Sequence, residues 1–282
     1  METTSAADEA GDLARAELAY LIDLQMSPLG LAAMIALSPT RGQTVLDVGC
    51  GAGETILQLA DRVGPDGRIV GVDIAPRVLA VAQTRTAHLQ QVTLVQEDAI
   101  KVALPDQSLD CIFSRFGMMF FSNPTAAFAN MQRMLKPEGK IGFVCWRSMQ
   151  DNEIDRFPLE AARLSVAVDN TPFSFENPDT IERVLRATGF DHIRIKANDA
   201  RISSGGVDAM VKVLTRVGPL GKILREAPVL LHEAEIKVRA ALSTRERGGK
   251  VSLGAATWIV TAAVAGMKPG NGRSIVDDLK AA

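Results

Sequence analysis

The chain has 282 residues, of which 47% are hydrophobic, and its formal net charge is −2 at pH 7. This length fits one large α/β domain, or one such domain with an added lid, and the apolar content is enough for a substantial core. Because the charge is nearly balanced, no global field attracts the chain to nucleic acid or to an anionic membrane, and we expect no nucleic-acid partner.

The N-terminal segment is predicted to be helical after a short lead. Residues 1–10 are small and acidic and are expected to be disordered. Apolar residues then recur at helical spacing over Leu13–Met26. Pro28 and Pro39 bracket a second predicted helix, Leu29–Leu37.

Strands and helices alternate over the next hundred or so residues of the chain. Short apolar runs bounded by turn residues predict five strands: Thr44–Val48, Arg68–Val72, Val92–Gln96, Leu109–Phe113 and Lys140–Trp146. Helical spacing predicts the helices Glu54–Arg62, Pro76–His88 and Thr125–Leu135. Alternation of this kind predicts a parallel sheet with helices on both faces.

The pattern changes after residue 147. Helices are predicted over Glu153–Val168 and Thr180–Thr188, and strands over Ile193–Ile202 and Gly254–Val264. The segment Val207–Leu242 separates these two strands and predicts two or three helices. Its apolar positions suit the covering of a pocket, and we interpret the segment as a lid.

A glycine-rich turn follows the first predicted strand. Gly49, Gly51 and Gly53 have the spacing G-x-G-x-G, and Asp73 closes the next strand about 20 residues on. This is the layout of a nucleotide-binding βαβ unit. A dinucleotide site has a glycine where this chain has Glu54, whose carboxylate would repel a pyrophosphate. It would tolerate S-adenosylmethionine, a nucleoside ligand with a cationic amino-acid tail and no phosphate.

At these residues the chain resembles a known family. Val45–Ala60 is similar to the cofactor loop of class I S-adenosylmethionine-dependent methyltransferases. The resemblance continues in the family's order through Gly71–Ile74, Gln96–Ala99, Leu109–Ser114 and Leu135–Lys140. The form of Ser114–Phe121 is most similar to the small-molecule type, including quinone-biosynthesis-like methyltransferases.

The resemblance carries expectations about fold and cofactor. It implies a Rossmann-like, seven-stranded, mostly parallel sheet with helices on both faces and an antiparallel edge strand. N-terminal helices and the helical lid insertion would be added to this core. S-adenosyl-L-methionine would be the cofactor, and S-adenosyl-L-homocysteine the product.

The same resemblance places the cofactor site at the ends of the first four strands. Asp47 would help to hold the loop and the amino end of the cofactor, and Asp73 would accept hydrogen bonds from both ribose hydroxyls. Ile74 would pack on the adenine, and Asp98 would accept from its amine. The expected cofactor-binding residues are Asp47, Gly49, Gly51, Gly53, Asp73, Ile74, Asp98, Ala99 and Ser114.

An apolar loop follows the fourth predicted strand. Phe116–Phe121 packs under the lid or lines an apolar acceptor pocket, and both alternatives stay open. The expected pocket residues are Arg115, Phe116, Met118, Met119 and Phe120. The loop lacks the Asn/Asp-Pro-Pro-Tyr/Phe pattern of the family's amine-methylating nucleic-acid enzymes, which argues against methylation of nucleic-acid amines.

No catalytic residue is assigned from the sequence. A sulfonium is already an activated leaving group, so a general base is needed only if the acceptor must first lose a proton. Arg115 and His232 are the candidates, and a structural salt bridge is an equal alternative for Arg115. The cysteines lack zinc-ligand spacing, so we expect reduced thiols and no metal: Cys50, Cys111 and Cys145.

The sequence therefore predicts an enzyme that transfers a methyl group in line from S-adenosylmethionine to a small, largely apolar acceptor, with aromatic and quinone-like compounds among the alternatives. A non-catalytic S-adenosylmethionine-binding protein, a protein methyltransferase and an NAD-dependent oxidoreductase are the rival hypotheses. A homodimer is kept as an alternative to a monomer.

Four parts of the chain are expected. They are an N-terminal helical segment (1–40), the S-adenosylmethionine-binding core (41–204), the lid insertion (205–250), and the last core strand with a C-terminal tail (251–282). The acidic N-terminus does not resemble a signal peptide. The longest apolar run, Gly254–Met267, is too short and too rich in small residues to span a bilayer. We therefore expect a cytoplasmic protein without membrane insertion.

Overall fold

A computed structural model describes residues 6–164 and 168–265. Its centre is a seven-stranded sheet with the strand order β3-β2-β1-β4-β5-β7-β6. The strands are β1 (Thr44–Val48), β2 (Arg68–Asp73), β3 (Val92–Gln96), β4 (Leu109–Arg115), β5 (Leu135–Trp146), β6 (Phe190–Gly205) and β7 (Val251–Val264). All seven predicted strands are present.

The first five strands pair in parallel, and β7 is antiparallel to both of its neighbours, β5 and β6. The expected Rossmann-like, mostly parallel sheet is therefore confirmed. The antiparallel strand is β7, one place in from the edge, and β6 forms the edge itself. The last two strands make the antiparallel pair that the resemblance implied.

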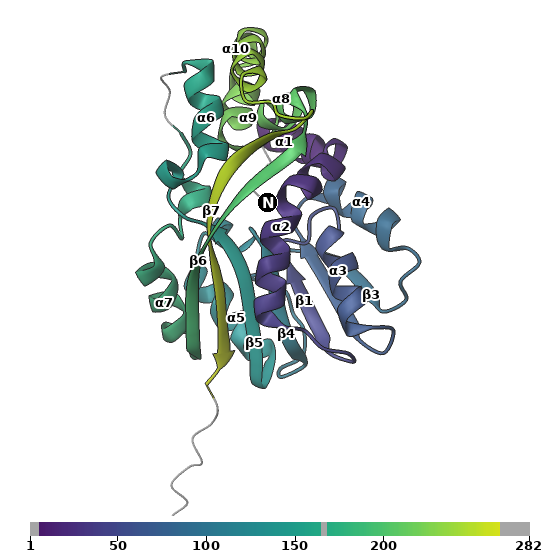
Figure 1. Ribbon diagram of the computed structural model, residues 1–282. Coiled ribbons are helices and arrows are strands. Elements are labelled where there is room, and N and C mark those ends of the chain that lie inside the picture. The colour runs from purple at the N-terminus through teal and green to yellow at the C-terminus, as the bar shows by residue number, and fades with distance from the viewer. Residues whose placement is uncertain (1–5, 165–167, 266–282) are drawn as a thin grey trace, which may run out of the picture.

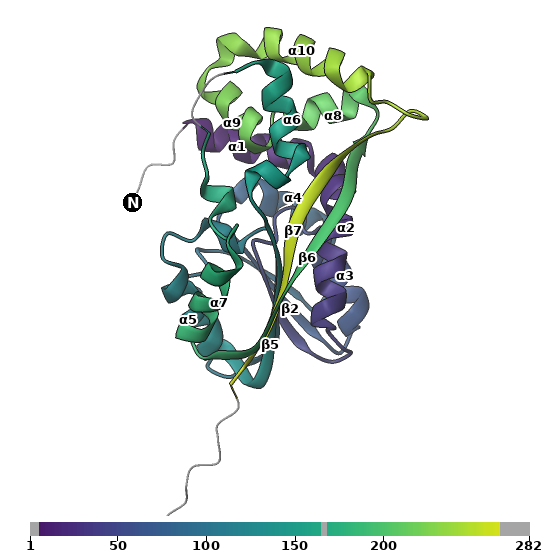
Figure 2. The same cartoon turned by 60° about the vertical axis from the view of Figure 1, so that its left-hand side comes forward.

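Helices cover both faces of the sheet. The helices α2 (Ala19–Leu37), α3 (Glu54–Val63) and α4 (Pro76–Thr86) lie on one face, and α5 (Pro124–Met134) and α7 (Pro178–Ala187) lie on the other (Figure 2). This follows from the chain order, because right-handed crossovers on opposite sides of β1 place their helices on opposite faces.

A layer of helices lies beyond the carboxyl ends of the parallel strands. Figure 1 shows this cap above the sheet. It contains α1 (Ala6–Glu17), α6 (Glu153–Ala162), α8 (Val207–Leu214), α9 (Gly218–Glu226) and α10 (Leu231–Ser243). The last three are the helices predicted between the final two strands, and α9 packs on both α1 and α6. The cap is thus built from three separate parts of the chain.

Three helix predictions were wrong at the N-terminus. The predicted helix Leu13–Met26 is interrupted at Leu18, because α1 ends at Glu17 and α2 begins at Ala19. The segment from Ala6 to residue 10, expected to be disordered, is the start of α1. The expected break at Pro28 is also absent, because α2 runs through it without interruption. Proline has no backbone N–H, so Pro28 removes one hydrogen bond from the helix. Because Pro28 is exposed, the bond is lost on the solvent side, where a helix tolerates the loss best.

The helix α2 is long and apolar enough to cross a membrane by length and composition, with 19 residues and a mean hydropathy of 1.4. In the fold it instead packs against β4, β5, β6 and β7. Its buried positions include Leu29, Ala33, Met34 and Leu37. These side chains form part of the main hydrophobic core, which explains the high hydropathy.

Two further boundaries differ from the predictions. The strand β5 begins at Leu135 rather than Lys140, because Leu135 pairs with Leu109 before a bulge in the ladder. The helix α6 ends at Ala162, whereas the prediction extended it to Val168. Arg163 has a φ of 56° and so closes α6 with a left-handed residue. Part of the remaining predicted span, residues 165–167, lies outside the described residues.

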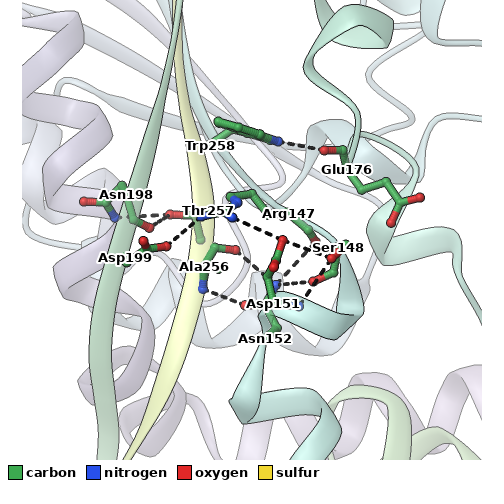
Figure 3. A network of polar contacts seen from close by, with 10 residues as sticks. All are labelled: Arg147, Ser148, Asp151, Asn152, Glu176, Asn198, Asp199, Ala256, Thr257 and Trp258. Atoms are coloured by element: carbon green, nitrogen blue, oxygen red, sulfur yellow. Dashed lines mark hydrogen bonds and ion pairs between the residues drawn. The ribbon is translucent and has the colours of Figure 1, made fainter.

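A buried asparagine ties the cap to the sheet just beyond the end of β5 (Figure 3). The Asn152 amide donates to the Ala256 oxygen at 3.0 Å, and its oxygen accepts from the Ala256 nitrogen at 2.7 Å. Around it, Arg147 donates to Asp199 at 2.8 Å and to Asp151 at 3.2 Å. Asn152 therefore extends the β5–β7 ladder with its side chain at Ala256, whose oxygen also accepts from the Arg147 amide at 3.0 Å.

We predict that Asn152→Ala lowers the free energy of unfolding by about 1–3 kcal/mol, because it leaves the buried Ala256 amide unpaired, while the Ala256 oxygen keeps its bond from the Arg147 amide. Urea denaturation followed by circular dichroism measures this. The matched control is Asn198→Ala, which removes one half-buried contact with Thr257 at 3.1 Å and should cost less than about 1 kcal/mol. Equal losses in the two variants would contradict the ladder role.

Candidate functional site

The glycine loop lies where β1 turns into α3. The Gly49 and Cys50 amides donate to the Val72 oxygen at 2.8 and 3.1 Å, which ties the loop to the end of β2. Gly49, Gly51 and Gly53 have φ values of 70°, 52° and 86°, which few other residues adopt. A Cβ on Gly51 would have nothing within 4 Å, so the loop faces open space at this residue.

Asp73 closes β2 and is bound to the loop. One carboxylate oxygen accepts from the Gly51 amide at 2.9 Å, and the other accepts from the Ala75 amide at 3.0 Å. Burial nevertheless raises the pKa of Asp73 above its ordinary value. Two amides orient the carboxylate, and each oxygen keeps a lone pair that can accept from a ligand.

Asp47 lies inside β1 and is fully buried. One of its carboxylate oxygens accepts from the Thr55 hydroxyl, and the other has no hydrogen-bond partner. Burial raises the pKa of Asp47 to about 7, although the Thr55 bond and the positive charge of Arg115 oppose the rise. A buried carboxylate with an unused oxygen is poised to accept from a cationic ligand group.

The residues proposed to hold the adenine lie near the ends of β2 and β3. Ile74 is 69% exposed directly after Asp73. The Asp98 carboxylate accepts from the Ile100 amide at 3.0 Å, and Ala99 is buried. The exposed Ile74 side chain leaves an apolar surface available to a flat ring.

Ser114 has a different environment from the one expected. It is fully buried at the end of β4. Its hydroxyl donates to the Val48 oxygen at 2.7 Å and accepts from the Gly117 amide at 3.1 Å. Ser114 therefore ties the end of β1 to the loop after β4, and both of its polar contacts are with the protein backbone.

Arg115 takes part in a network of ion pairs. Its guanidinium pairs with Glu54 at the start of α3 and with Asp23 of α2, the latter at 3.1 Å. Asp23 also pairs with Arg85 of α4 at 2.7 Å, and Arg85 donates to the Ala52 oxygen in the glycine loop at 3.2 Å. The Glu54 carboxylate is therefore neutralised by Arg115, so its charge is a weaker argument against a pyrophosphate than the sequence indicated.

The sequence reasoning did not identify Asp23 and Arg85. Asp23 is a single acidic residue in an apolar helix, and that contrast was the available signal. Arg85 had none, since it is one of two arginines on a short helix. Only the approach of α2 and α4 to the loop reveals the network.

The apolar loop after β4 divides into buried and accessible parts. Met118 and Met119 are buried in the core, and Phe120 is 56% exposed. Phe116 has a φ of 62° and stacks on Trp146, with ring centroids 4.2 Å apart. A non-glycine residue in this conformation is strained, which is common at functional sites. The stacked pair lies at the ends of the neighbouring strands β4 and β5.

His232 does not lie near these residues in the fold. It is exposed at the start of α10, a helix that packs on α6 and α8. Among the described residues, no group of three or more histidines, cysteines and acidic residues is arranged to hold a metal ion. Cys50, Cys111 and Cys145 are all buried free thiols.

Comparison with known proteins identifies the family of the core. A family model described as a methyltransferase domain matches residues 45–139. Demethylmenaquinone methyltransferase from Staphylococcus aureus is 27% identical in an alignment of 187 residues that covers 60% of this chain and 75% of that protein.

Solved structures share the fold. An S-adenosylmethionine-dependent methyltransferase from Aquifex aeolicus aligns with a TM-score of 0.52 at 16% identity, over 93% of this chain and 100% of that chain. Phosphoethanolamine N-methyltransferase 2 from Haemonchus contortus, in complex with phosphomonomethylethanolamine and S-adenosylhomocysteine, aligns with a TM-score of 0.53 at 20% identity. That alignment covers 85% of this chain and 52% of that chain.

The domain match lies on the glycine loop and the strands that carry Asp47 and Asp73, and the chain shares its fold with solved methyltransferases. These findings decide against the oxidoreductase hypothesis. Residues 45–139 therefore form a class I S-adenosylmethionine-dependent methyltransferase domain, with S-adenosyl-L-methionine as its cofactor.

Proposed function

We propose that this enzyme methylates a small, largely apolar acceptor, of which an aromatic or quinone-like ring is the favoured form. The cofactor would lie at the carboxyl ends of β1, β2 and β3, and the acceptor beyond β4 and β5. This arrangement follows the rule that ligands of open α/β sheets bind outside the carboxyl ends of the strands, where the connections diverge.

The residues present fit the cofactor. The unpartnered oxygen of Asp47 suits the ammonium group of a methionine tail. The carboxylate of Asp73, oriented by two amides, suits two ribose hydroxyls. The open space at Gly51 admits a ligand close to the backbone. Ile74, Asp98 and Ala99 remain the proposed adenine contacts, and Ser114 supports the site by joining the strand ends.

When bound, S-adenosylmethionine supplies a methyl group on an activated sulfonium. The protein's own part is then to hold the acceptor in line and to exclude water, which can contribute several kcal/mol of barrier reduction. No base is assigned. The exposed position of His232 on α10 removes it from the proposal, and the ion pairs of Arg115 favour a structural role for that residue.

The observation that carries the acceptor class is the half-buried ring of Phe116, which stacks on the buried Trp146 at the strand ends, together with the exposed ring of Phe120 in the same loop. Aromatic surfaces suit flat apolar ligands. Met118 and Met119 would support this surface from below, since both are buried. The relative from Staphylococcus aureus is named for a quinone-type acceptor, which supports the same class.

The division of the chain belongs to this proposal. Residues 41–204 would form the catalytic core, with 251–264 as its last strand, and residues 1–40 and 205–250 would cover the site. Since α8, α9 and α10 lie beyond the carboxyl ends of the strands, they are placed to act as the lid (Figure 1). We also propose a cytoplasmic location and a small molecule, not nucleic acid, as the partner, in keeping with the net charge of −2.

Transfer of labelled methyl groups tests the acceptor class. The purified enzyme is incubated with methyl-labelled S-adenosylmethionine and a fractionated cell extract, and we expect the label in the organic-soluble, low-mass fraction. Label in protein or RNA would contradict the proposal. With the product identified, Phe116→Leu should raise the KM for the acceptor about tenfold, the scale of a lost aromatic contact, and leave cofactor affinity within about twofold.

The matched control for Phe116→Leu is Phe157→Leu. Phe157 is a half-buried ring on α6 that contacts Arg245 rather than the strand ends, with 4.2 Å between the guanidinium and the ring centroid. This variant should leave the KM for the acceptor unchanged. Equal effects of the two substitutions would remove Phe116 from the acceptor pocket.

We predict that Asp73→Asn weakens S-adenosylmethionine binding by about 1.5–3 kcal/mol, because a charged acceptor of hydrogen bonds is lost. Isothermal titration calorimetry measures the affinity directly and needs no acceptor. Asp66→Asn, a change in the exposed turn before β2, is the control and should bind normally. Unchanged affinity of Asp73→Asn would place the ribose elsewhere.

Asp47 should make cofactor binding depend on pH. Its pKa of about 7 means that the carboxyl group is almost fully protonated at pH 5.5 and about half ionised at about pH 7. A cationic amine binds the ionised form, so affinity should rise about tenfold over this range, in which an α-amino group with a pKa of about 7.7–8.0 stays mostly protonated. Calorimetry of Asp47→Asn should show weaker binding without this rise. The same pH dependence in the variant would exclude Asp47 as its source.

A further inference from the structure

The N-terminal helix α2 is joined to the cofactor loop by charges. Asp23 of α2 binds two guanidinium groups at once, those of Arg85 at 2.7 Å and Arg115 at 3.1 Å. Arg85 also donates to the Ala52 oxygen in the glycine loop at 3.2 Å. Arg115 also pairs with Glu54, the first residue of α3. The two arginines, which we call the arms of the network, therefore contact the chain on both sides of Gly53.

The network is shielded from solvent. The side chains of Arg115 and Asp23 are only 12% and 13% exposed, and that of Arg85 is 25% exposed. Ion pairs at this depth are screened less than surface pairs, and removal of one partner leaves the other charge desolvated. Asp23 is the one member that contacts both guanidinium groups.

The backbone of α2 is shaped to admit this network. A Cβ on Gly30 would lie 2.7 Å from the Cδ atom of Arg115, so the arginine crosses the helix where it has no side chain. The Gln58 amide of α3 also reaches α2, at the Ser27 hydroxyl, 2.9 Å away. In α1, Asp12 accepts from the Arg77 and Val78 amides at 3.0 and 3.3 Å and so caps α4.

We propose that Asp23 is a positioning residue for the cofactor site: it holds Arg85 and Arg115 so that they fix the glycine loop at Ala52 and Glu54. This inference rests on the proposed placement of the cofactor at that loop. The N-terminal helices are then part of the cofactor site and not only its cover. Asp23 acts through the arginines and does not itself need to touch the ligand.

Asp23→Asn tests the role, because it keeps the shape of the side chain and removes its charge. We expect the Kd for S-adenosylmethionine to rise about tenfold, and the Kd for S-adenosylhomocysteine to rise by the same factor. The second ligand lacks the sulfonium charge, so equal losses indicate a loosened loop. In the ligand-free protein, the amides of residues 49–54 should exchange with deuterium faster than in the wild type.

Arg85→Gln removes the arm to Ala52 and gives a second variant at a more exposed side chain, should Asp23→Asn fail to fold. Its Kd should also rise about tenfold. In the double variant, Asp23→Asn with Arg85→Gln, the Kd should rise no more than about twofold beyond that of the weaker-binding single variant. The reason is that both changes break the same connection, from Asp23 through Arg85 to Ala52. The control is Glu17→Gln, which breaks the ion pair of α1 with Arg216 and should leave binding unchanged.

Three results would overturn the inference. The first is unchanged affinity and amide exchange in Asp23→Asn. The second is a loss confined to S-adenosylmethionine, which would indicate a simple charge effect on a cationic ligand. The third is an equal loss in Glu17→Gln, which would indicate general loosening of the N-terminal helices. Asp73→Asn in the same assay distinguishes a failure of this inference from a failure of the proposed cofactor site. If Asp73→Asn also binds S-adenosylmethionine normally, the proposed cofactor site is itself wrong.

Discussion

The close approach of β1 and β4 at their carboxyl ends is the constraint on which the rest of the site depends. A Cβ on Gly117 would lie 2.6 Å from the Val48 oxygen, and one on Gly49 would lie 3.1 Å from the Gly117 Cα. The Ser114 hydroxyl joins the two strand ends. From this point the chain leaves β1 toward one face of the sheet and β4 toward the other, and the crevice between the two connections is the proposed ligand site.

Charge is concentrated at this crevice at a cost in solvation. Asp47 and Asp73 lose water, and the pKa values of both rise as a result. Amides and the Thr55 hydroxyl stabilise their ionised forms only in part, and one oxygen of Asp47 remains without a partner. In the proposed function, a cationic ligand group would supply the partner that this oxygen lacks. Arg115 and Asp23 act on the outer side of the same loop.

Most of the core could be predicted because its signals are local. The strand Val92–Gln96 was predicted to the residue, since apolar alternation and turn residues define it. The glycine spacing and Asp73 carried the cofactor assignment. Boundaries were less predictable where a tertiary contact decided them: Leu135 joins β5 because it pairs with Leu109, and α2 continues through Pro28 because that residue faces solvent.

The roles within the site were harder to predict for the same reason. Ser114 was expected to face the cofactor, yet its hydroxyl is used between two backbones. The apolar loop was one feature in the sequence and is two in the fold, with Met118 and Met119 in the core and Phe116 stacked on Trp146. Burial depends on what packs above each residue, and hydrophobicity alone does not report it.

The sequence by itself determined the alternating core, the glycine loop and the class of cofactor, because each depends on residues close together along the chain. Only the tertiary structure decided which charges meet there. Arg85 lies 62 positions after Asp23 in the sequence, and Arg115 lies 92 positions after it. The three side chains nevertheless form one network of ion pairs. No periodic pattern in the sequence predicts ion pairs of this kind, because the side chains meet only once α2 has packed on the sheet beside the loop.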